Sequence, residues 1–204
     1  MEPKSAYTVR FSESGLPSGE WYVNITSQSA RAASGSEISY HLLNGTYSYT
    51  IATSYKDYAP SQASGSFTVD GKNVTMPEVI FSLVTYRVTF IESGLQKAAA
   101  WILGLQGNYY VNDTGTLSLK LPNGTYTYNA TSLSGNSYKA NGGIFTINGK
   151  SLNLSVVFVK YYTIVFTEKG LPTGDKWIVV FDGEDNSSIS PDNASFTVPN
   201  GTYS

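Results

Sequence analysis

One stretch of sequence occurs three times in this chain, and self-similarity of this kind fixes the architecture before any local motif is considered. The copies begin at Phe11, Phe90 and Phe166 and share the pattern Phe-x-Glu-x-Gly-Leu. The offsets are 79 residues (11 to 90) and 76 residues (90 to 166). A tryptophan and then an Asn-Gly-Thr-Tyr tetrapeptide follow each copy. The chain is therefore a tandem array of one building block.

The repeated positions define a structural signature of glutamate, glycine, tryptophan and tyrosine. Its members are Glu13, Gly15, Trp21, Gly45, Tyr47, Glu92, Gly94, Trp101, Gly124, Tyr126, Glu168, Gly170, Trp177, Gly201 and Tyr203. Their spacing predicts two full repeats, residues 1–84 and 85–160, and a partial repeat at 161–204. The partial repeat holds only a front half, which ends in its Asn-Gly-Thr-Tyr.

The hydrophobic pattern has a period of two, which is typical of strands with one buried face. Tyr7, Val9 and Phe11 alternate with polar residues, and the pattern returns at 86–90 and 162–166. Helix signals are nearly absent. Short strands separated by frequent turns predict an all-β fold of tandem Ig-like or prealbumin-like antiparallel β-sandwiches. Each repeat would have six or seven strands in about 77 residues.

Turn residues predict how these strands connect. Asp70-Gly71 and Asn148-Gly149 indicate two-residue hairpins. The strands that close the two full repeats are expected at 74–84 and 152–159. Pro77 lacks an N–H and belongs at an edge or a bulge. The polar segment after the second strand of each repeat is predicted to be a loop.

The partial third repeat would leave an apolar face and strand edges uncovered. The sequence contains three front halves but only two back halves. One interpretation is that the repeat is truncated. The alternatives are a strand donated by a partner, or a homo-oligomer in which two unpaired halves associate. Another copy of this chain has no unused back half to donate.

Composition excludes several classes of function. The chain has no cysteine and one histidine, so disulfides, thiolate metal sites and histidine metal clusters are not expected. A net charge of −2 argues against a nucleic-acid partner. No apolar run has the length of a membrane span. The first four residues show no signal-peptide pattern, so an exported chain would be a mature form.

Asn-x-Ser/Thr sequences favour export, because they read as surface positions open to N-glycosylation. The alternative is that they arise by chance from abundant Asn, Ser and Thr. An extracellular or cell-surface location is expected, with glycans as candidate partners. The sites are Asn24, Asn44, Asn73, Asn112, Asn123, Asn129, Asn153, Asn186, Asn193 and Asn200.

The recurring Glu13, Glu92 and Glu168 are the first candidates for chemistry. A catalytic carboxylate needs a partner acid or base at a matched distance, and no other acid recurs with them. A glutamate beside a glycine turn is expected to accept backbone N–H bonds. No catalytic residue, metal ligand or cofactor-binding residue is therefore predicted.

The aromatic residues are the second set of candidates for a functional role. The tryptophans could stack against sugars, but they fall on the buried side of the second strand, which favours core packing. Tyr47, Tyr49, Tyr126 and Tyr128 are expected to divide between the core and an exposed row suited to adhesion or glycan contact.

Three further motifs bear on function. The acidic segment 182–186 offers oxygen ligands that suit calcium but lacks a calcium-loop spacing, which favours a solvated loop. His41 is expected on a half-exposed strand. An internal Lys–Asn crosslink would need a lysine in the first strand, where Arg10, Arg87 and Val165 stand instead.

The combined motif resembles a known class of repeat. The order Tyr-x-Val-x-Phe-x-Glu-Ser-Gly-Leu-Pro, Trp, Asn-Gly-Thr-Tyr-x-Tyr and Ser-Gly-x-Phe-Thr-Val-x-Gly is similar to repeats of archaeal surface proteins, including those that accompany thermopsin-type proteases. Asn-Gly-Thr-Tyr followed by Tyr58-Ala59-Pro60 is more distantly similar to prealbumin-like stalk domains of bacterial adhesins. Gln96 and Lys169 depart from the pattern.

The resemblance implies a non-enzymatic, extracellular structural or adhesive role in an archaeal surface, envelope or filament. The alternative is a glycan- or surface-binding module attached to an exported hydrolase such as a thermopsin-like protease. No protease site is carried over, because no protease domain is recognisable in the chain.

Overall fold

The computed structural model describes residues 5–26, 28–135 and 137–204, and these residues form strands, turns and loops without a helix. None of them therefore forms a helix able to span a membrane. The predicted all-β fold of sandwich repeats is confirmed. The chain separates into two compact units, Met1–Thr85 and Tyr86–Ser204.

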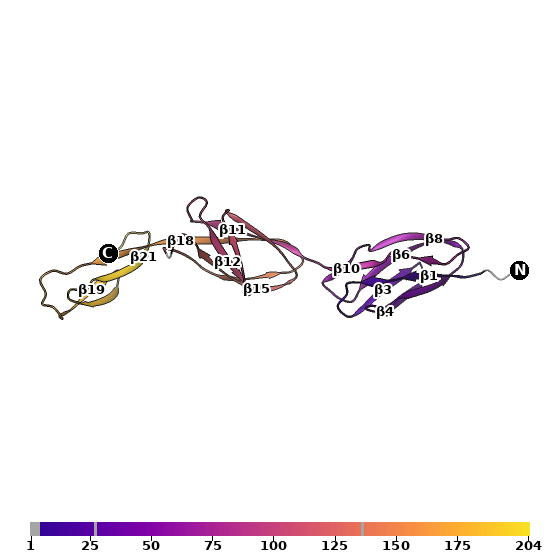
Figure 1. The fold of residues 1–204 in the computed structure, drawn as a ribbon, viewed down its shortest axis with the longest axis horizontal. Helices are drawn as coiled ribbons and strands as arrows, with labels where there is room; N and C mark the ends of the chain where they lie inside the picture. Colours follow the sequence, from indigo (N-terminus) through magenta and orange to yellow (C-terminus); the bar gives the residue numbers. More distant parts are fainter. Residues whose placement is uncertain (1–4, 27, 136) are drawn as a thin grey trace. The chain divides into compact units, whose positions relative to one another are not determined.

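The first unit contains ten strands in its described part (Figure 1). They are β1 (Tyr7–Phe11), β2 (Glu13–Ser14), β3 (Glu20–Ile25), β4 (Gln28–Ala33), β5 (Ile38–Leu42), β6 (Gly45–Thr53), β7 (Tyr58–Pro60), β8 (Ser64–Val69), β9 (Val74–Thr75) and β10 (Val79–Leu83).

These strands form two layers. One layer is the sheet β4-β3-β6-β8. The other consists of β5-β1-β9 and β2-β10-β7, in which β1 and β2 continue one another across Ser12. The inward side chains meet in an aromatic core, where Phe11 contacts Tyr49 and Phe67 at centroid distances of 5.4 and 6.0 Å. The period-two pattern places these rings on one face of each strand.

The second unit contains the remaining strands. They are β11 (Tyr86–Ser93), β12 (Trp101–Leu105), β13 (Asn108–Asn112), β14 (Thr116–Leu121), β15 (Gly124–Ser132), β16 (Tyr138–Ala140), β17 (Gly143–Ile147), β18 (Leu152–Phe166), β19 (Lys176–Phe181), β20 (Glu184–Ile189) and β21 (Ala194–Pro199).

The part of the second unit up to β18 repeats the two layers. Strands β13, β12, β15 and β17 form one layer, and β14, β11, β18 and β16 form the other. Phe90 contacts Tyr128 and Phe145 at 5.3 and 5.7 Å, which reproduces the aromatic core of the first unit.

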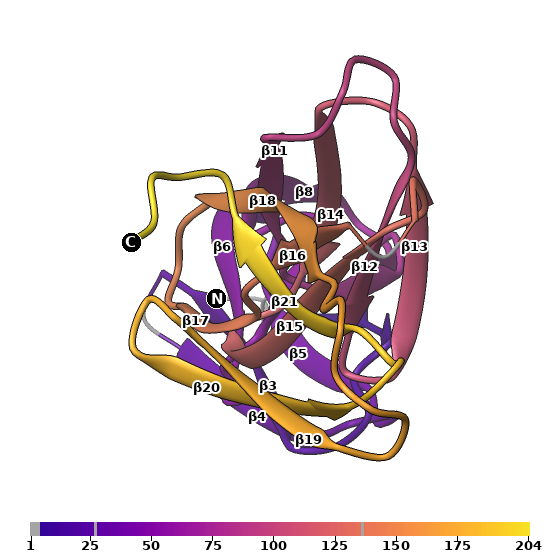
Figure 2. The same ribbon diagram turned by 90° about the vertical axis from the view of Figure 1, so that its left-hand side faces the viewer.

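The residues after β18 form a smaller arrangement. Strands β19 and β20 make one hairpin, and β21 pairs with the end of β18 (Figure 2). Among the described residues of 161–204, the buried hydrophobic side chains are Ala194 and Phe196. The division into three repeats at residues 84 and 160 stays a prediction, since β18 runs through the second of these positions without a break.

The predicted hairpins at Asp70-Gly71 and Asn148-Gly149 are wrong. Strand β8 pairs with β6, whereas β9 pairs with β1 in the opposite layer. In the second unit, β17 pairs with β15 and β18 pairs with β11. Each turn carries the chain from one layer to the other, so local turn residues alone do not reveal which strands will pair.

The sandwiches also contain parallel pairs, which the sequence pattern did not predict. They are β1 with β9, β2 with β10, and β11 with β18. After crossing between layers, the closing strand runs in the same direction as the first strand. In the first unit it is split around Pro77 into β9 and β10, in keeping with the missing N–H of proline.

Strands β4 and β13 lie where loops were predicted. Both are edge strands that pair only with the tryptophan strand of their layer, β3 or β12, in the described part of the chain. An edge strand with few core contacts tolerates polar side chains. The hydrophobic signal of β4 is therefore weak, whereas β13 carries Tyr109, Tyr110 and Val111 at its centre.

Candidate functional site

Two of the three repeated glutamates, Glu92 and Glu168, bind the turn that follows them. Glu92 Oε1 accepts the backbone N–H of Leu95 at 2.8 Å. Glu168 Oε2 accepts the N–H of Leu171 at 3.2 Å. Each carboxylate thereby satisfies an amide of the Ser-Gly-Leu or Lys-Gly-Leu turn, which would otherwise need another partner.

Glu13 is placed differently from the other two. Its Oε1 accepts the N–H of Gly35 at 2.6 Å, so it binds the loop after β4 instead of its own turn. Its side chain is buried, and its Oε2 has no hydrogen-bond partner among the described residues. The described residues contain no cluster of three acidic or histidine groups that could hold a metal. The glutamates thus position backbone in all three repeats.

Two of the three tryptophans belong to the core. Trp21 and Trp101 are fully buried, and their Nε1 atoms donate to the carbonyls of Ser36 and Thr114 at 3.1 and 3.0 Å. Their faces are not available to a ligand. Trp177 is only half-buried, and its shielded Nε1 has no partner in the described part of the chain.

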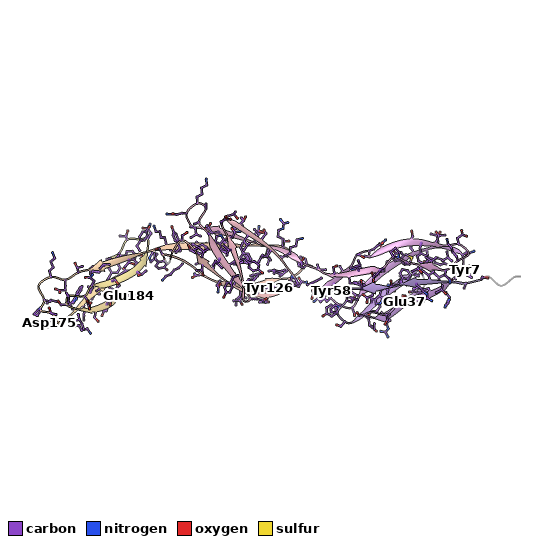
Figure 3. The ribbon with its side chains drawn as sticks, in the orientation of Figure 1. Tyr7, Glu37, Tyr58, Tyr126, Asp175 and Glu184 are labelled. Carbon is purple, nitrogen blue, oxygen red and sulfur yellow. The ribbon has the colours of Figure 1, made fainter. Side chains whose placement is uncertain are left out.

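The Asn-Gly-Thr-Tyr tetrapeptide builds a corner at the start of a strand. The hydroxyl of Tyr126 donates to the carbonyl of Pro122 at 2.9 Å, and burial raises the pKa of this tyrosine (Figure 3). The hydroxyl of Tyr47 makes the equivalent bond in the first unit, donating to the carbonyl of Leu43 at 2.9 Å. The ring lies over the glycine: a Cβ on Gly124 would stand 3.3 Å from it.

The asparagine of the tetrapeptide accepts a hydrogen bond from the turn that connects the two layers. Asn44 Oδ1 accepts the N–H of Gly71 at 2.9 Å, and Asn123 Oδ1 accepts the N–H of Gly149 at 2.8 Å. Both bonds join residues 26 or 27 positions apart. The sequence Asn-Gly-Thr-Tyr therefore recurs for a structural reason as well as matching a glycosylation sequence.

Replacing Tyr126 with phenylalanine tests this corner. The variant loses the bond to Pro122 but keeps the ring in the core. We expect the free energy of unfolding of the second unit to fall by about 1 kcal/mol, measured by urea unfolding. Thr127→Val, on the exposed side of the same strand, serves as the control. A loss no greater than that of the control would contradict the role of the hydroxyl.

The predicted glycosylation sites differ in how their amides are engaged. Asn112 Nδ2 donates to the carbonyl of Thr116 and Asn186 Nδ2 to that of Ser195. The exposed sites are Asn24, Asn44, Asn73, Asn129, Asn153, Asn193 and Asn200. Glycosylation of every site stays a prediction.

The remaining motifs lie apart from one another in the chain. The prediction that the acidic segment 182–186 is a loop is wrong for residues 184–186, which belong to β20. Only Asp182 and Gly183 form the turn of the β19–β20 hairpin, with φ of 53° and 83°. Figure 3 shows Glu184 on this hairpin. His41 is exposed, with its Nδ1 3.4 Å from Thr8 Oγ1.

A hollow on the outer face of the second repeat was not predicted from the sequence. Gly104 is buried between Tyr109 on β13 and Asn129 on β15, and a Cβ at Gly104 would stand 2.2 Å from Asn129 Oδ1 and 3.4 Å from the ring of Tyr109. Gln106, Gly107, Thr127 and Tyr128 complete the lining, and the described lining carries no charged side chain. Tyr109 is 74% exposed. A glycine within an otherwise apolar strand is the sequence signal for a site where another group comes close to the backbone.

Comparison with known proteins supports the fold. No family model matches the chain, and no curated protein matches it. The TIE protein of Bacillus anthracis superimposes with a TM-score of 0.53 at 19% identity, over 98% of this chain and 44% of that one. This chain therefore spans 44% of the length of the TIE protein.

Two pilins are also among the similar structures. The D295N mutant of the shaft pilin SpaA of Lactobacillus rhamnosus GG gives a TM-score of 0.34 at 13% identity, over 75% of this chain and 98% of that one. The minor pilin GBS52 of Streptococcus agalactiae gives 0.34 at 11%, over 82% and 99%. The similarity to the TIE protein is a similarity of fold. The two pilins superimpose on this chain less well.

Proposed function

We propose that this chain is a non-enzymatic, extracellular structural or adhesive repeat protein of an archaeal surface, envelope or filament. The observation that carries the proposal is the use of the signature residues. The glutamates bind backbone amides, Trp21 and Trp101 fill the core, and the tetrapeptides form corners. The residues that recur in this sequence thus stabilise the fold of the repeats.

Further support comes from resemblance and fold. The repeated motif is similar to that of archaeal surface proteins, and the TIE protein has a similar all-β fold. Repeat proteins gain size by adding copies of a unit with its own core. The candidate partners are glycans at the exposed asparagines.

The location can be tested on intact source cells. A membrane-impermeant amine reagent is expected to label lysines of the protein before lysis, and peptides with exposed sequences such as Asn153 are expected to carry added hexose mass. Asn186, whose Nδ2 is engaged with Ser195, provides an internal comparison. Labelling only after lysis, with unmodified peptides throughout, would overturn the proposal.

A second candidate function, a glycan-binding module attached to an exported hydrolase, is favoured by the hollow at Gly104. An exposed aromatic ring beside uncharged amide and hydroxyl groups suits a neutral sugar. Tyr109→Ala is expected to abolish binding on a glycan array. Tyr55→Ala, which removes a less exposed ring in the other unit, serves as the control. Equal binding by the native chain and both variants would exclude this site.

A further inference from the structure

The second repeat exposes the outer edge of strand β13. In the order β13-β12-β15 this strand lies at the margin of its sheet, and among the described strands only β12 pairs with it (Figure 2). Its outward side chains are apolar, since Tyr109 is 74% exposed and Val111 is 66% exposed. Ile102, which lies opposite Val111 on β12, is only half-buried and extends the apolar surface. Exposed apolar edge strands are sites for pairing with another chain.

The hairpin between β12 and β13 fixes which backbone groups of this edge are free. Its two-residue turn, 106–107, has φ of 46° and 84°, and Leu105 pairs with Asn108. The pair that closes such a turn is hydrogen-bonded, and bonded and unbonded pairs then alternate along an antiparallel ladder. Tyr109 and Val111 therefore direct their N–H and C=O groups away from β12.

The edge strands at the same place in the other two repeats carry charge. Arg31 on β4 holds the position of Val111, and its Nη1 lies 3.4 Å from Glu20 Oε2. On β20, Asp185 holds the position of Tyr109. Strand β13 has no charged residue. Charged side chains commonly prevent edge strands from pairing with other chains, so the second repeat lacks a protection that the others have.

The side-chain pattern of β13 is complementary to itself. When two copies of the strand meet antiparallel with Tyr110 of each on a two-fold axis, Tyr109 lies opposite Val111 of the second copy. The free N–H and C=O groups of these two residues then face each other and can exchange both backbone bonds. An aromatic ring opposite a β-branched side chain is a favourable cross-strand pair, and an uncharged strand meets its copy without like-charge repulsion.

We propose that β13 is a contact surface between two copies of this chain, which pair edge to edge about a two-fold axis at Tyr110. The proposal deepens the structural role given above, on which it rests, by naming a lateral contact between molecules. The contact joins the β13 layers of the two copies into one antiparallel sheet. A strand of five residues buries less than the ~1,200 Å² of a stable interface, so the pairing is weak between isolated molecules and gains strength where many copies lie side by side.

Self-association of the purified chain provides the test. We expect the sedimentation coefficient to rise with concentration up to about 1 mM, the range in which a weak interface associates. The amide NMR signals of residues 108–112 should shift over the same range. Val111→Arg, which introduces the charge that Arg31 supplies in the first repeat, should raise the Kd of the dimer at least about tenfold.

Ile144→Arg is the matched control for the added charge. Ile144 is 72% exposed, faces the same side of the sheet as Val111, and lies on β17 at the opposite edge. This variant should associate as the native chain does, and both variants should keep the native unfolding midpoint because both replaced side chains are exposed. A chain that stays monomeric, or association that is unchanged by Val111→Arg or weakened equally in both variants, would overturn the proposal.

Disulfide cross-linking tests the register, because the chain has no cysteine of its own. In the proposed dimer, residue 109 of one copy faces residue 111 of the other, with Cα atoms about 5.5 Å apart, which suits a disulfide. A mixture of Tyr109→Cys and Val111→Cys chains should therefore form the mixed disulfide faster than either chain cross-links with itself. Equal rates for all three products would rule out this register.

These measurements are separable from the tests of function given above. All of them use purified protein, so a negative result leaves the test of surface location on intact cells unaffected. Val111 lies outside the described lining of the hollow at Gly104, so Val111→Arg also leaves the glycan-binding test intact.

Discussion

Trp101→Ala is expected to remove a large share of the stability of the second repeat. The indole is fully buried, packs against Phe158 and donates to the carbonyl of Thr114 at 3.0 Å. Removing a buried tryptophan costs about 3–5 kcal/mol through lost contacts and the cavity left behind. The whole stability of a small domain is about 5–15 kcal/mol. Amide hydrogen exchange of residues 86–160, measured by mass spectrometry, reports the loss.

Trp177→Ala is the matched control for this prediction. The third tryptophan is half-buried, and its Nε1 has no partner in the described part of the chain. Its removal should cost about 1–2 kcal/mol, in proportion to the smaller apolar area withdrawn from water. Equal losses in the two variants would mean that Trp101 does not anchor a tighter core than Trp177.

Gly94→Ala is expected to destabilise the second repeat by about 3–5 kcal/mol, because two costs add. The residue has φ of +95°, a backbone conformation that disfavours a Cβ. The new methyl group would also stand 2.0 Å from the backbone oxygen of Phe158, which cannot rotate away. The closing strand would have to shift, and urea unfolding of the second unit would measure the effect.

Gly170→Ala separates these two costs. It has nearly the same backbone, with φ of +98°, but nothing within 4 Å of the added methyl group. Only the conformational cost of about 1–2 kcal/mol should remain. If the two alanine variants lose equal stability, then Gly94 is required only for its backbone conformation and the closing strand does not constrain it.

The sequence predicts the strands more reliably than their partners. Tyr7, Val9 and Phe11 alternate as expected, and β1 spans Tyr7–Phe11. The turn at Asp70-Gly71 was predicted to join two paired strands, yet it connects the two layers. Alternation reports which face of a strand is buried, whereas pairing depends on contacts between distant residues.

The candidate sites, like the strands, could be predicted from the sequence only in part. The motif identifies Gly94 and Gly170 as equivalent, but only the structure reveals that one touches the closing strand and the other faces open space. The hollow at Gly104 depends on β12 lying between β13 and β15. No spacing along the sequence places Tyr109 and Asn129 on either side of it.

The sequence by itself determined the repeat, the all-β class and the residues that form each turn, because alternation and glycine or asparagine turns are local properties of the chain. The tertiary structure alone decided the crossing between layers and the parallel closing strands. These features depend on which distant strands meet, and such contacts arise only when two sheets pack on a shared core.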